Sequence, residues 1–255
     1  MYIIIIIINS QTILLNKLSL PNHHHYQLIL KRRMNMSEKN QSLVTQAYNQ
    51  ILDFIMTKQL MPGERIPETK IAKELGFSRS PIREALRTLA NKGLINIYPH
   101  RFSEVATINE NDFYDIGTTR VSLDTMAVKL ALLNGNLMEF HKLKEIAEDC
   151  LKAHEDNNIP LRLKLDADFH RYLIEISRNK LFIKYQKELE VRVQFIILHG
   201  WNEFDKERKN LEQHLELVDA LCHHDEERAI QIIQDHLITF YKLREKYPSS
   251  FFKNY

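Results

Sequence analysis

The chain has 255 residues, of which 44% are hydrophobic and 27% are charged. This composition allows a sizeable core and excludes disorder throughout. With only six Gly and seven Pro, the chain does not suit a sandwich or barrel of many tight turns, so we expect a mainly helical protein. Its two cysteines, Cys150 and Cys222, are too few for a disulfide framework or a thiolate zinc cluster, which favours a reducing cytoplasm.

The net charge of +2 hides a gradient along the chain. Residues 1–40 carry five Lys and Arg against one acid, residues 41–107 carry nine against six, and residues 108–255 carry twenty-one against twenty-six. The longest apolar run, at residues 3–8, is too short to cross a bilayer and follows no basic residue, so neither a membrane helix nor a secretory signal is predicted. We expect a cytoplasmic protein without a membrane partner, whose basic front meets a polyanion.

Residues 1–40 show no helical or strand period. They contain the isoleucine run, three consecutive histidines at 23–25 and the basic cluster at 31–33. We interpret them as an unfolded tail and an over-extended reading frame, with the natural start at Met34 or Met36. The histidines could bind a metal, but such a biased tract is more typical of an unstructured segment.

Residues 41–107 predict a compact winged helix-turn-helix domain. An amphipathic helix runs from Ser42 to about Gln59, a turn follows at 61–63, and a second short helix ends at Gly76. A third helix opens at residues 78–81, where a serine can cap it and Pro81 is tolerated in the first turn. Two strand-like runs, at 94–98 and 103–107, predict a small β-hairpin wing.

Residues 108–247 show only helical periods and predict an all-α second domain, with residues 248–255 as a C-terminal tail. Clusters of turn-forming residues at 134–136, 157–160 and 223–225 predict breaks between its helices. The fold class is therefore mainly α, with an N-terminal winged helix-turn-helix and a C-terminal helical bundle that binds a ligand.

The third helix predicts contact with DNA. Arg79, Arg83 and Arg87 are spaced four residues apart, so they line one face, next to the apolar set that faces the core. Such a helix can enter the major groove, where arginines pair with guanine edges or hold phosphates. Arginines on a solvated surface, paired for example with Glu84, are the alternative.

The order of these elements resembles the N-terminal domain of the GntR family of bacterial transcription regulators. The resemblance covers residues 42–107 and rests on the segments 62–66 (PGERI), 74–87 (ELGFSRSPIREALR) and 93–95 (GLI). It implies that Arg79 and Arg83 read the operator, that Lys70 contacts DNA, and that His100 and Arg101 lie at the tip of the wing. The family usually has a glycine at the wing turn where this chain has Phe102.

The second domain contains residues that suit a metal ion. Asp166 and His170 lie one turn apart on one face of a helix, and His214 and His236 lie on two later helices. Three imidazoles and one carboxylate suit Zn²⁺, Ni²⁺ or Mn²⁺ better than Ca²⁺ or Mg²⁺. With twelve histidines in the chain, each one alone is more typical of a surface or core residue.

These four residues also resemble the ligand-binding domain of the FCD subgroup of GntR regulators, over about residues 110–240. The resemblance implies that Asp166, His170, His214 and His236 hold a divalent metal, Zn²⁺ first and Ni²⁺ or Mn²⁺ as alternatives. A small organic acid would occupy the open positions on the metal. Arg120 and Arg192 are candidates to clamp its carboxylate, although Arg120 could instead pair with Asp124 one turn away.

The sequence therefore predicts a transcriptional regulator, a repressor rather than an enzyme, whose DNA binding responds to a small carboxylate. A homodimer is implied, because two recognition helices about one turn of DNA apart read a pseudo-palindromic operator. Two alternatives stay open: a metalloenzyme that uses the Asp/His₃ set, and a regulator for which the metal itself is the signal.

Overall fold

A computed structural model describes residues 6–8, 11–13, 42–200 and 204–252. The chain divides into two compact units, one made of Met1–Leu52 with Pro67–Ala85 and the other of Asp53–Ile66 with Leu86–Tyr255. Two short strands near the start, β1 (Ile6–Ile8) and β2 (Gln11–Ile13), form an antiparallel pair. We predicted no regular element there, but β-branched isoleucines favour extended backbone. The rest of the predicted tail before residue 42 lies outside the described residues.

The winged helix-turn-helix has the predicted order of elements. They are α2 (Leu43–Met56), α3 (Glu68–Leu75), α4 (Arg79–Asn91), β3 (Ile95–Tyr98) and β4 (Phe102–Val105). The predicted apolar stripes are buried, including Ile51 and Ile55 on α2 and Ile82 and Leu89 on α4. Gly76 ends α3 in the left-handed conformation, with φ 67°, as predicted.

The wing is an antiparallel hairpin in which Tyr98 lies opposite Phe102. The Arg101 amide donates to the Tyr98 carbonyl at 3.1 Å, and His100 takes the left-handed position of the turn with φ 60°. Phe102 therefore begins a strand instead of filling the turn. Its ring lies 4.0 Å from the Arg65 guanidinium, a cation–π contact. The wing thus forms without the family's glycine.

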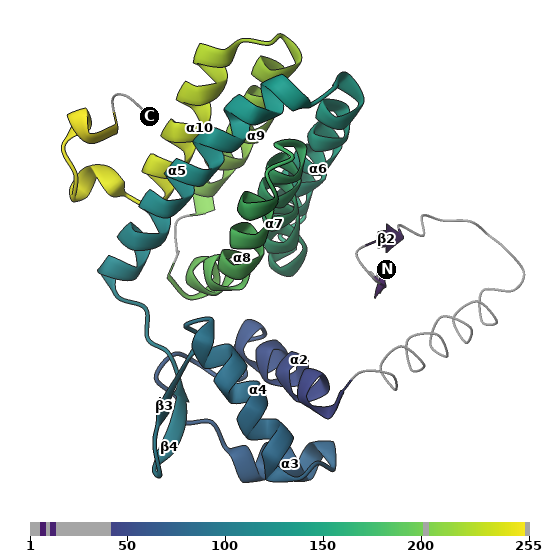
Figure 1. The fold of residues 1–255 in the computed structure, drawn as a ribbon, viewed down its shortest axis with the longest axis vertical. Coiled ribbons are helices and arrows are strands. Elements are labelled where there is room, and N and C mark those ends of the chain that lie inside the picture. Colours follow the sequence, from purple (N-terminus) through teal and green to yellow (C-terminus); the bar gives the residue numbers. More distant parts are fainter. Residues whose placement is uncertain (1–5, 9–10, 14–41, 201–203, 253–255) are drawn as a thin grey trace, which may run out of the picture. The chain divides into compact units, whose positions relative to one another are not determined.

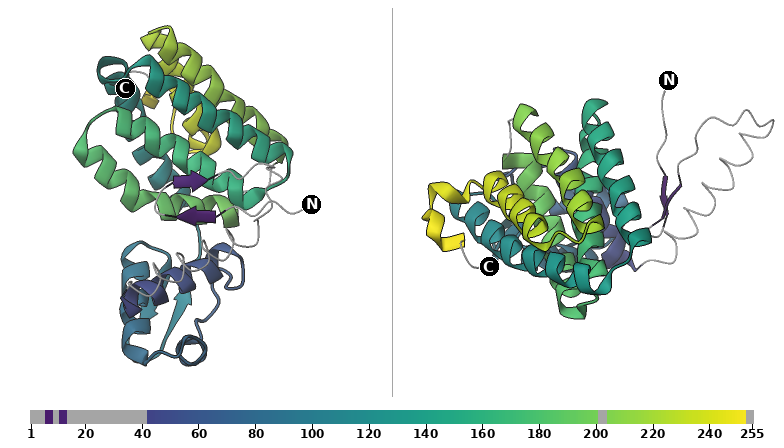
Figure 2. Two further views of the ribbon diagram at one scale, coloured as in Figure 1. Left: turned by 90° about the vertical axis from the view of Figure 1, so that its right-hand side faces the viewer. Right: turned by 90° about the horizontal axis from the view of Figure 1, so that it is seen from above.

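The second domain is entirely helical (Figures 1 and 2). Its helices are α5 (Glu110–Asn134), α6 (Leu137–Glu155), α7 (Ile159–Ile176), α8 (Lys180–Gly200), α9 (Phe204–Cys222) and α10 (Glu226–Phe240). Two short 3₁₀ helices follow, η1 (Leu243–Glu245) and η2 (Ser249–Phe252). Helix α5 packs against α7 and α10, and α6 packs against α7 and α9. Among the described helices, none combines the length and apolar character that a membrane span requires.

Polar caps fix the points at which the chain reverses in this domain. The side chains of Asn109 and Asn136 accept hydrogen bonds from the backbone at the starts of α5 and α6, and both form capping boxes. Asn158 caps α7, and Asp225 caps α10. The three predicted breaks between helices are therefore confirmed.

The chain beyond α10 packs closely against α5 at one glycine. A Cβ atom added at Gly117 would lie 2.6 Å from the Cβ of Tyr241 and 2.8 Å from Leu243. Tyr241 and Leu243 are both buried. Because glycine has no Cβ atom, the C-terminal segment can approach α5 at Gly117. This approach places Tyr241 in the interior of the bundle.

Candidate functional site

The three arginines of α4 are exposed to solvent. Arg79, Arg83 and Arg87 occupy successive turns, so they line one face of the helix. The only ion pair recorded for them among the described residues joins Arg83 Nε to Glu68 Oε2 at 3.4 Å. The Arg83 side chain is 61% exposed, so water screens this pair and it contributes little to stability. The arginines can therefore exchange such contacts for those with a polyanion.

The other predicted DNA contacts are exposed as well. Lys70 projects from α3, and its ammonium lies 3.9 Å from the Glu74 carboxylate one turn away. His100 and Arg101 stand at the tip of the wing. Their roles toward DNA stay predictions.

Three of the predicted metal ligands converge inside the helical domain. His170, His214 and His236 come from α7, α9 and α10, are all buried, and place one ring nitrogen each within 4.8 Å of the others. The Nε2 atoms of His214 and His236 lie 3.3 Å apart. Asp166 joins them, with its Oδ1 atom 3.8 Å from His214 Nε2. The three histidines therefore meet at one place, and Asp166 lies beside His214.

Neighbouring groups orient two of these rings. His236 Nδ1 lies 3.1 Å from the carbonyl oxygen of Asn210. A carbonyl only accepts hydrogen bonds, so the proton of His236 sits on Nδ1 and the lone pair of Nε2 points toward His214. The His214 ring stacks on Phe169, with centroids 4.0 Å apart and planes at 17°. Apolar packing thus holds one ring and a hydrogen bond holds the other.

The electrostatics of the cluster favour neutral imidazoles. Burial is the largest cause that lowers the pKa of His214, and electrostatic interaction with the neighbouring His170 and Arg120 lowers it further. The pKa of His236 is also well below its usual value, again mainly through burial. Both rings are therefore neutral at neutral pH, which is the form that binds a metal ion.

The residues present fit a divalent ion. Ligand atoms at about 2.0–2.1 Å from a tetrahedral Zn²⁺ lie about 3.3 Å from one another, and the two Nε2 atoms of His214 and His236 have this spacing. His170 Nε2 is buried and has no hydrogen-bond partner among the described residues, so a ligand atom is available there. Three imidazoles and a carboxylate form a donor set typical of Zn²⁺ and its neighbours.

Arg120 forms a buried ion pair on α5. Its Nη2 atom lies 2.9 Å from Asp124 Oδ2, and its Nη1 atom lies 3.4 Å from the hydroxyl oxygen of Tyr241. From the sequence we gave this ion pair, between residues one helical turn apart, as the alternative to a role of Arg120 in binding a carboxylate. Asp124 Oδ2 also lies 2.9 Å from His170 Nδ1. Sequence reasoning missed this contact, because no spacing links a residue of α5 to one of α7.

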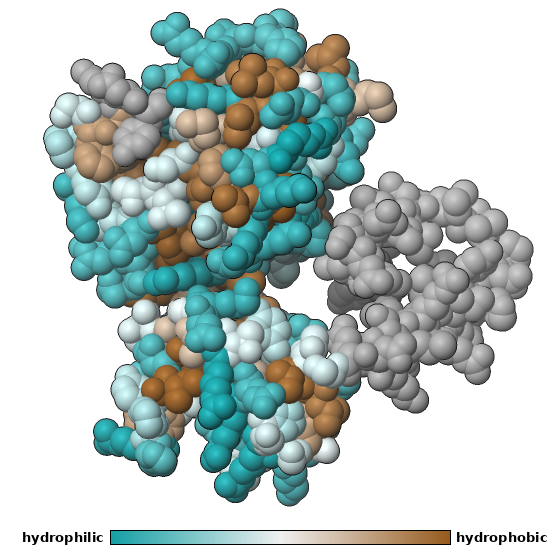
Figure 3. Space-filling model, in the orientation of Figure 1, coloured by the Kyte–Doolittle hydropathy of each residue, from teal (hydrophilic) through white to brown (hydrophobic). Residues whose placement is uncertain are grey.

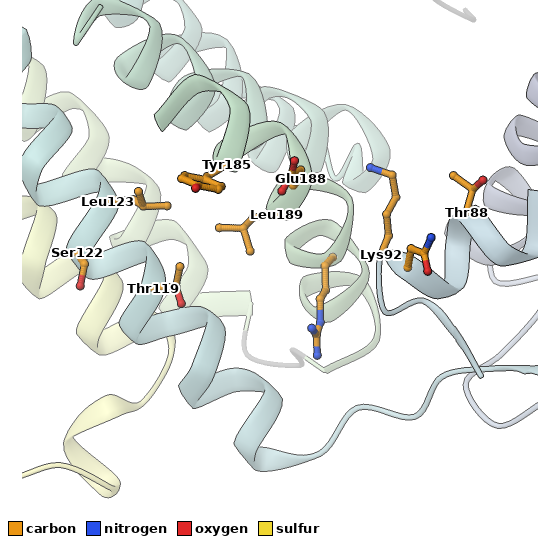
Figure 4. Close-up of a pocket in the computed structure, with 10 residues that line it drawn as sticks. Thr88, Lys92, Thr119, Ser122, Leu123, Tyr185, Glu188 and Leu189 are labelled. Atoms are coloured by element: carbon orange, nitrogen blue, oxygen red, sulfur yellow. The ribbon is translucent and has the colours of Figure 1, made fainter. Parts of the chain in front are cut away.

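Arg192 lies elsewhere in the second unit. It pairs with Asp112 at 2.6 Å across α8 and α5. Figure 4 shows the shallow pocket that it lines, with Leu123 on α5 and Tyr185 and Leu189 on α8 among the other residues. None of the four predicted metal ligands lines this pocket. The structure therefore brings Arg120, and not Arg192, next to the histidine cluster.

These features define a DNA-binding head joined to an all-helical domain with a buried polar site. The model of the gntR family of bacterial regulatory proteins matches residues 43–102, and that of the FCD domain matches residues 115–239. Together the two matches cover well over half of the chain. The protein belongs to the GntR family of transcriptional regulators and carries an FCD domain at its C-terminal side.

Relatives and solved structures agree with this assignment. The HTH-type transcriptional regulator YdhC of Bacillus subtilis is 28% identical over 75% of this chain and 86% of its own length. The Nta operon transcriptional regulator of Aminobacter aminovorans is 29% identical over 69% of this chain and 82% of its own. The structure of Escherichia coli McbR/YncC superposes with a TM-score of 0.64 at 23% identity, covering 81% of this chain and all of the other, and supports the fold.

Proposed function

We propose that this regulator is a repressor whose operator binding is controlled by a small organic acid bound at a divalent metal in the FCD domain. The observation that supports the proposal is the convergence of His170, His214 and His236 from three helices in the interior of that domain, with Asp166 beside His214. Zn²⁺ suits the donor set first, with Ni²⁺ and Mn²⁺ as alternatives. The protein would act in the cytoplasm, where its operator lies.

The DNA-reading part of the proposal rests on α4. Its exposed arginines present five donors each in a planar fork, which suits guanine edges and phosphates. Arg79 and Arg83 would read bases, and Arg87, Lys70, His100 and Arg101 would hold the backbone or the minor groove. Phosphate contacts set position and affinity, whereas base contacts set the sequence that is read.

The sensing part rests on the buried cluster. A bound ion would supply a positive centre that attracts carboxylate oxygens. An acid could coordinate such an ion where the protein ligands leave a position open. Arg120 is fully buried, and its Nε atom has no hydrogen-bond partner among the described residues, so it can donate a further hydrogen bond to an acid. Binding can alter the affinity for DNA only if the acid prefers one of two conformations.

We further propose a homodimer on a pseudo-palindromic operator. Large apolar side chains remain exposed on the helical domain, with Met126 and Leu133 on α5 and Leu181 and Tyr185 on α8. Figure 3 shows hydrophobic residues among hydrophilic ones on the visible face of this domain. An interface between two copies would remove such side chains from water.

Gel retardation tests the DNA-reading part. The probe is a duplex that the wild-type protein selects from a random pool. We expect Arg83→Ala to weaken binding about tenfold or more, since one bidentate base contact contributes about 1–3 kcal/mol. Lys144→Ala on α6 is the control, because this exposed lysine pairs with Glu148 within the FCD domain. If Arg83→Ala and the wild type bound the duplex equally well, Arg83 would not contribute to the DNA interface.

A thermal-shift screen of small carboxylates, with and without added Zn²⁺, tests the sensing part. An acid that binds the folded state raises the melting temperature. We expect at least one acid to do so only in the presence of the ion, and the same acid to change retardation of the duplex. Turnover of the acid by the metal-loaded protein would instead support a metalloenzyme, and release of DNA by the ion alone would support a metal sensor.

A further inference from the structure

The metal ligand His170 has a close neighbour that belongs to neither the predicted ligands nor the DNA-reading residues. Asp124 lies on α5, and its side chain is fully buried. Its Oδ2 atom lies 2.9 Å from Arg120 Nη2 and 2.9 Å from His170 Nδ1. One carboxylate oxygen therefore bridges a guanidinium and the ring of a metal ligand.

Both ring nitrogens of His170 are buried, and neither meets the geometry of a hydrogen bond to a described residue. Nδ1 nevertheless lies 2.9 Å from Asp124 Oδ2. A carboxylate only accepts hydrogen bonds, so a His170 ring that donates to Asp124 has its proton on Nδ1 and leaves the lone pair of Nε2 for an ion.

We propose that Asp124 is a positioning residue of the metal site: it fixes the tautomer and orientation of His170 so that Nε2 faces the ion, and Arg120 holds Asp124 in place. The inference rests on the metal site put forward under the proposed function. Carboxylate–histidine–metal arrangements of this kind orient the ligand and raise its basicity. His236 uses the carbonyl oxygen of Asn210 in the same way.

The arrangement also assigns a role to Arg120. Arg120 contacts both the Asp124 carboxylate and, at 3.4 Å, the hydroxyl group of Tyr241. Tyr241 directly follows α10, the helix that carries His236. The close approach of Tyr241 to α5 depends on Gly117. Arg120, Asp124 and Tyr241, which do not coordinate the ion, thus connect α5 to the ligand His170 on α7 and to the end of α10.

Metal affinity of two matched double variants tests the proposal. Replacing Asp124 alone would leave Arg120 buried and unpaired, which is strongly destabilising. We therefore compare Arg120→Leu/Asp124→Asn with Arg120→Leu/Asp124→Leu. Both lack the two charges, but only the first keeps an oxygen that can accept from His170 Nδ1. We expect the second to bind Zn²⁺ about 10–100-fold more weakly than the first in a chelator competition.

Asp112→Asn is the control for this comparison, because Asp112 is on the same helix and pairs with Arg192. We expect it to bind Zn²⁺ as the wild type does. Equal Zn²⁺ affinity of the two double variants would overturn the role of Asp124. If the wild type still bound Zn²⁺ in that case, the proposed metal site itself would stand. A wild-type protein that binds no Zn²⁺ would instead refute the metal site itself.

A second measurement needs no variant. In the metal-free wild-type protein, the ¹⁵N shifts of the His170 ring report which nitrogen carries the proton. We expect the Nδ1–H tautomer. The Nε2–H tautomer would overturn the proposal, even if the double variants failed to fold.

Discussion

At the scale of single residues, the buried histidines make the stability of the metal-free protein depend on pH. The pKa values of His214 and His236 are lowered well below 6.5, mainly by burial. Below pH 6.5 the unfolded chain therefore takes up protons at these residues that the folded chain does not. The free energy of unfolding falls as the pH falls, by up to about 1.4 kcal/mol per pH unit for each histidine.

Urea unfolding with a chelator present, at pH 7.5, 6.5 and 5.5, measures this dependence. We expect the double variant His214→Leu/His236→Leu to lose less stability than the wild type between pH 6.5 and 5.5. His223→Ala is the control, because the side chain of this histidine, which directly follows α9, is 72% exposed and its loss should leave the dependence unchanged. The same pH dependence in the double variant and the wild type would contradict the account.

At the scale of helices, the caps are expected to matter more than the surface ion pairs. The Asn136 side chain accepts from the Glu139 amide at 3.1 Å, and the Glu139 carboxylate accepts from the Asn136 amide at 3.2 Å. We expect Asn136→Ala to lower the free energy of unfolding by about 0.5–2 kcal/mol, because it leaves backbone donors of α6 without partners.

Lys184→Ala is the comparison for this cap. The ammonium of Lys184 lies 3.9 Å from the Glu188 carboxylate, and both side chains are exposed. We expect a change of less than about 0.5 kcal/mol, since exposed pairs are screened by water. Denaturant unfolding of both variants measures which substitution lowers the free energy of unfolding more. A larger effect for Lys184→Ala would show that the cap is not what fixes the start of α6.

The helices and their order could be predicted from the sequence because their signals are local. Apolar periodicity and a residue such as Gly76, which ends α3, act within one helix, and the structure confirms them. The contact of Asp124 with His170 could not be predicted in this way, since it depends on how α5 packs against α7. The four predicted metal ligands lie on three helices, so we expected them to act together from the family resemblance and not from their spacing.

At the scale of the whole molecule, the charge gradient predicts steep salt dependence of DNA binding. Each phosphate contact made by a basic residue releases counterions. We expect affinity for the selected duplex to fall by more than about tenfold between 50 and 200 mM salt. Arg79→Ala should reduce the slope of log affinity against log salt, whereas Lys144→Ala in the FCD domain should not. A slope near zero for the wild type would contradict a phosphate-based interface.

The most direct test of the account is the metal content of the purified protein. Elemental analysis would be made after dialysis against Zn²⁺ and removal of the excess, on the wild type and on His170→Ala/His236→Ala. We predict one ion per chain in the wild type and close to none in the variant, with the variant still binding the selected duplex. The same metal content in both proteins would contradict the claim that these histidines, drawn from separate helices, hold the ion.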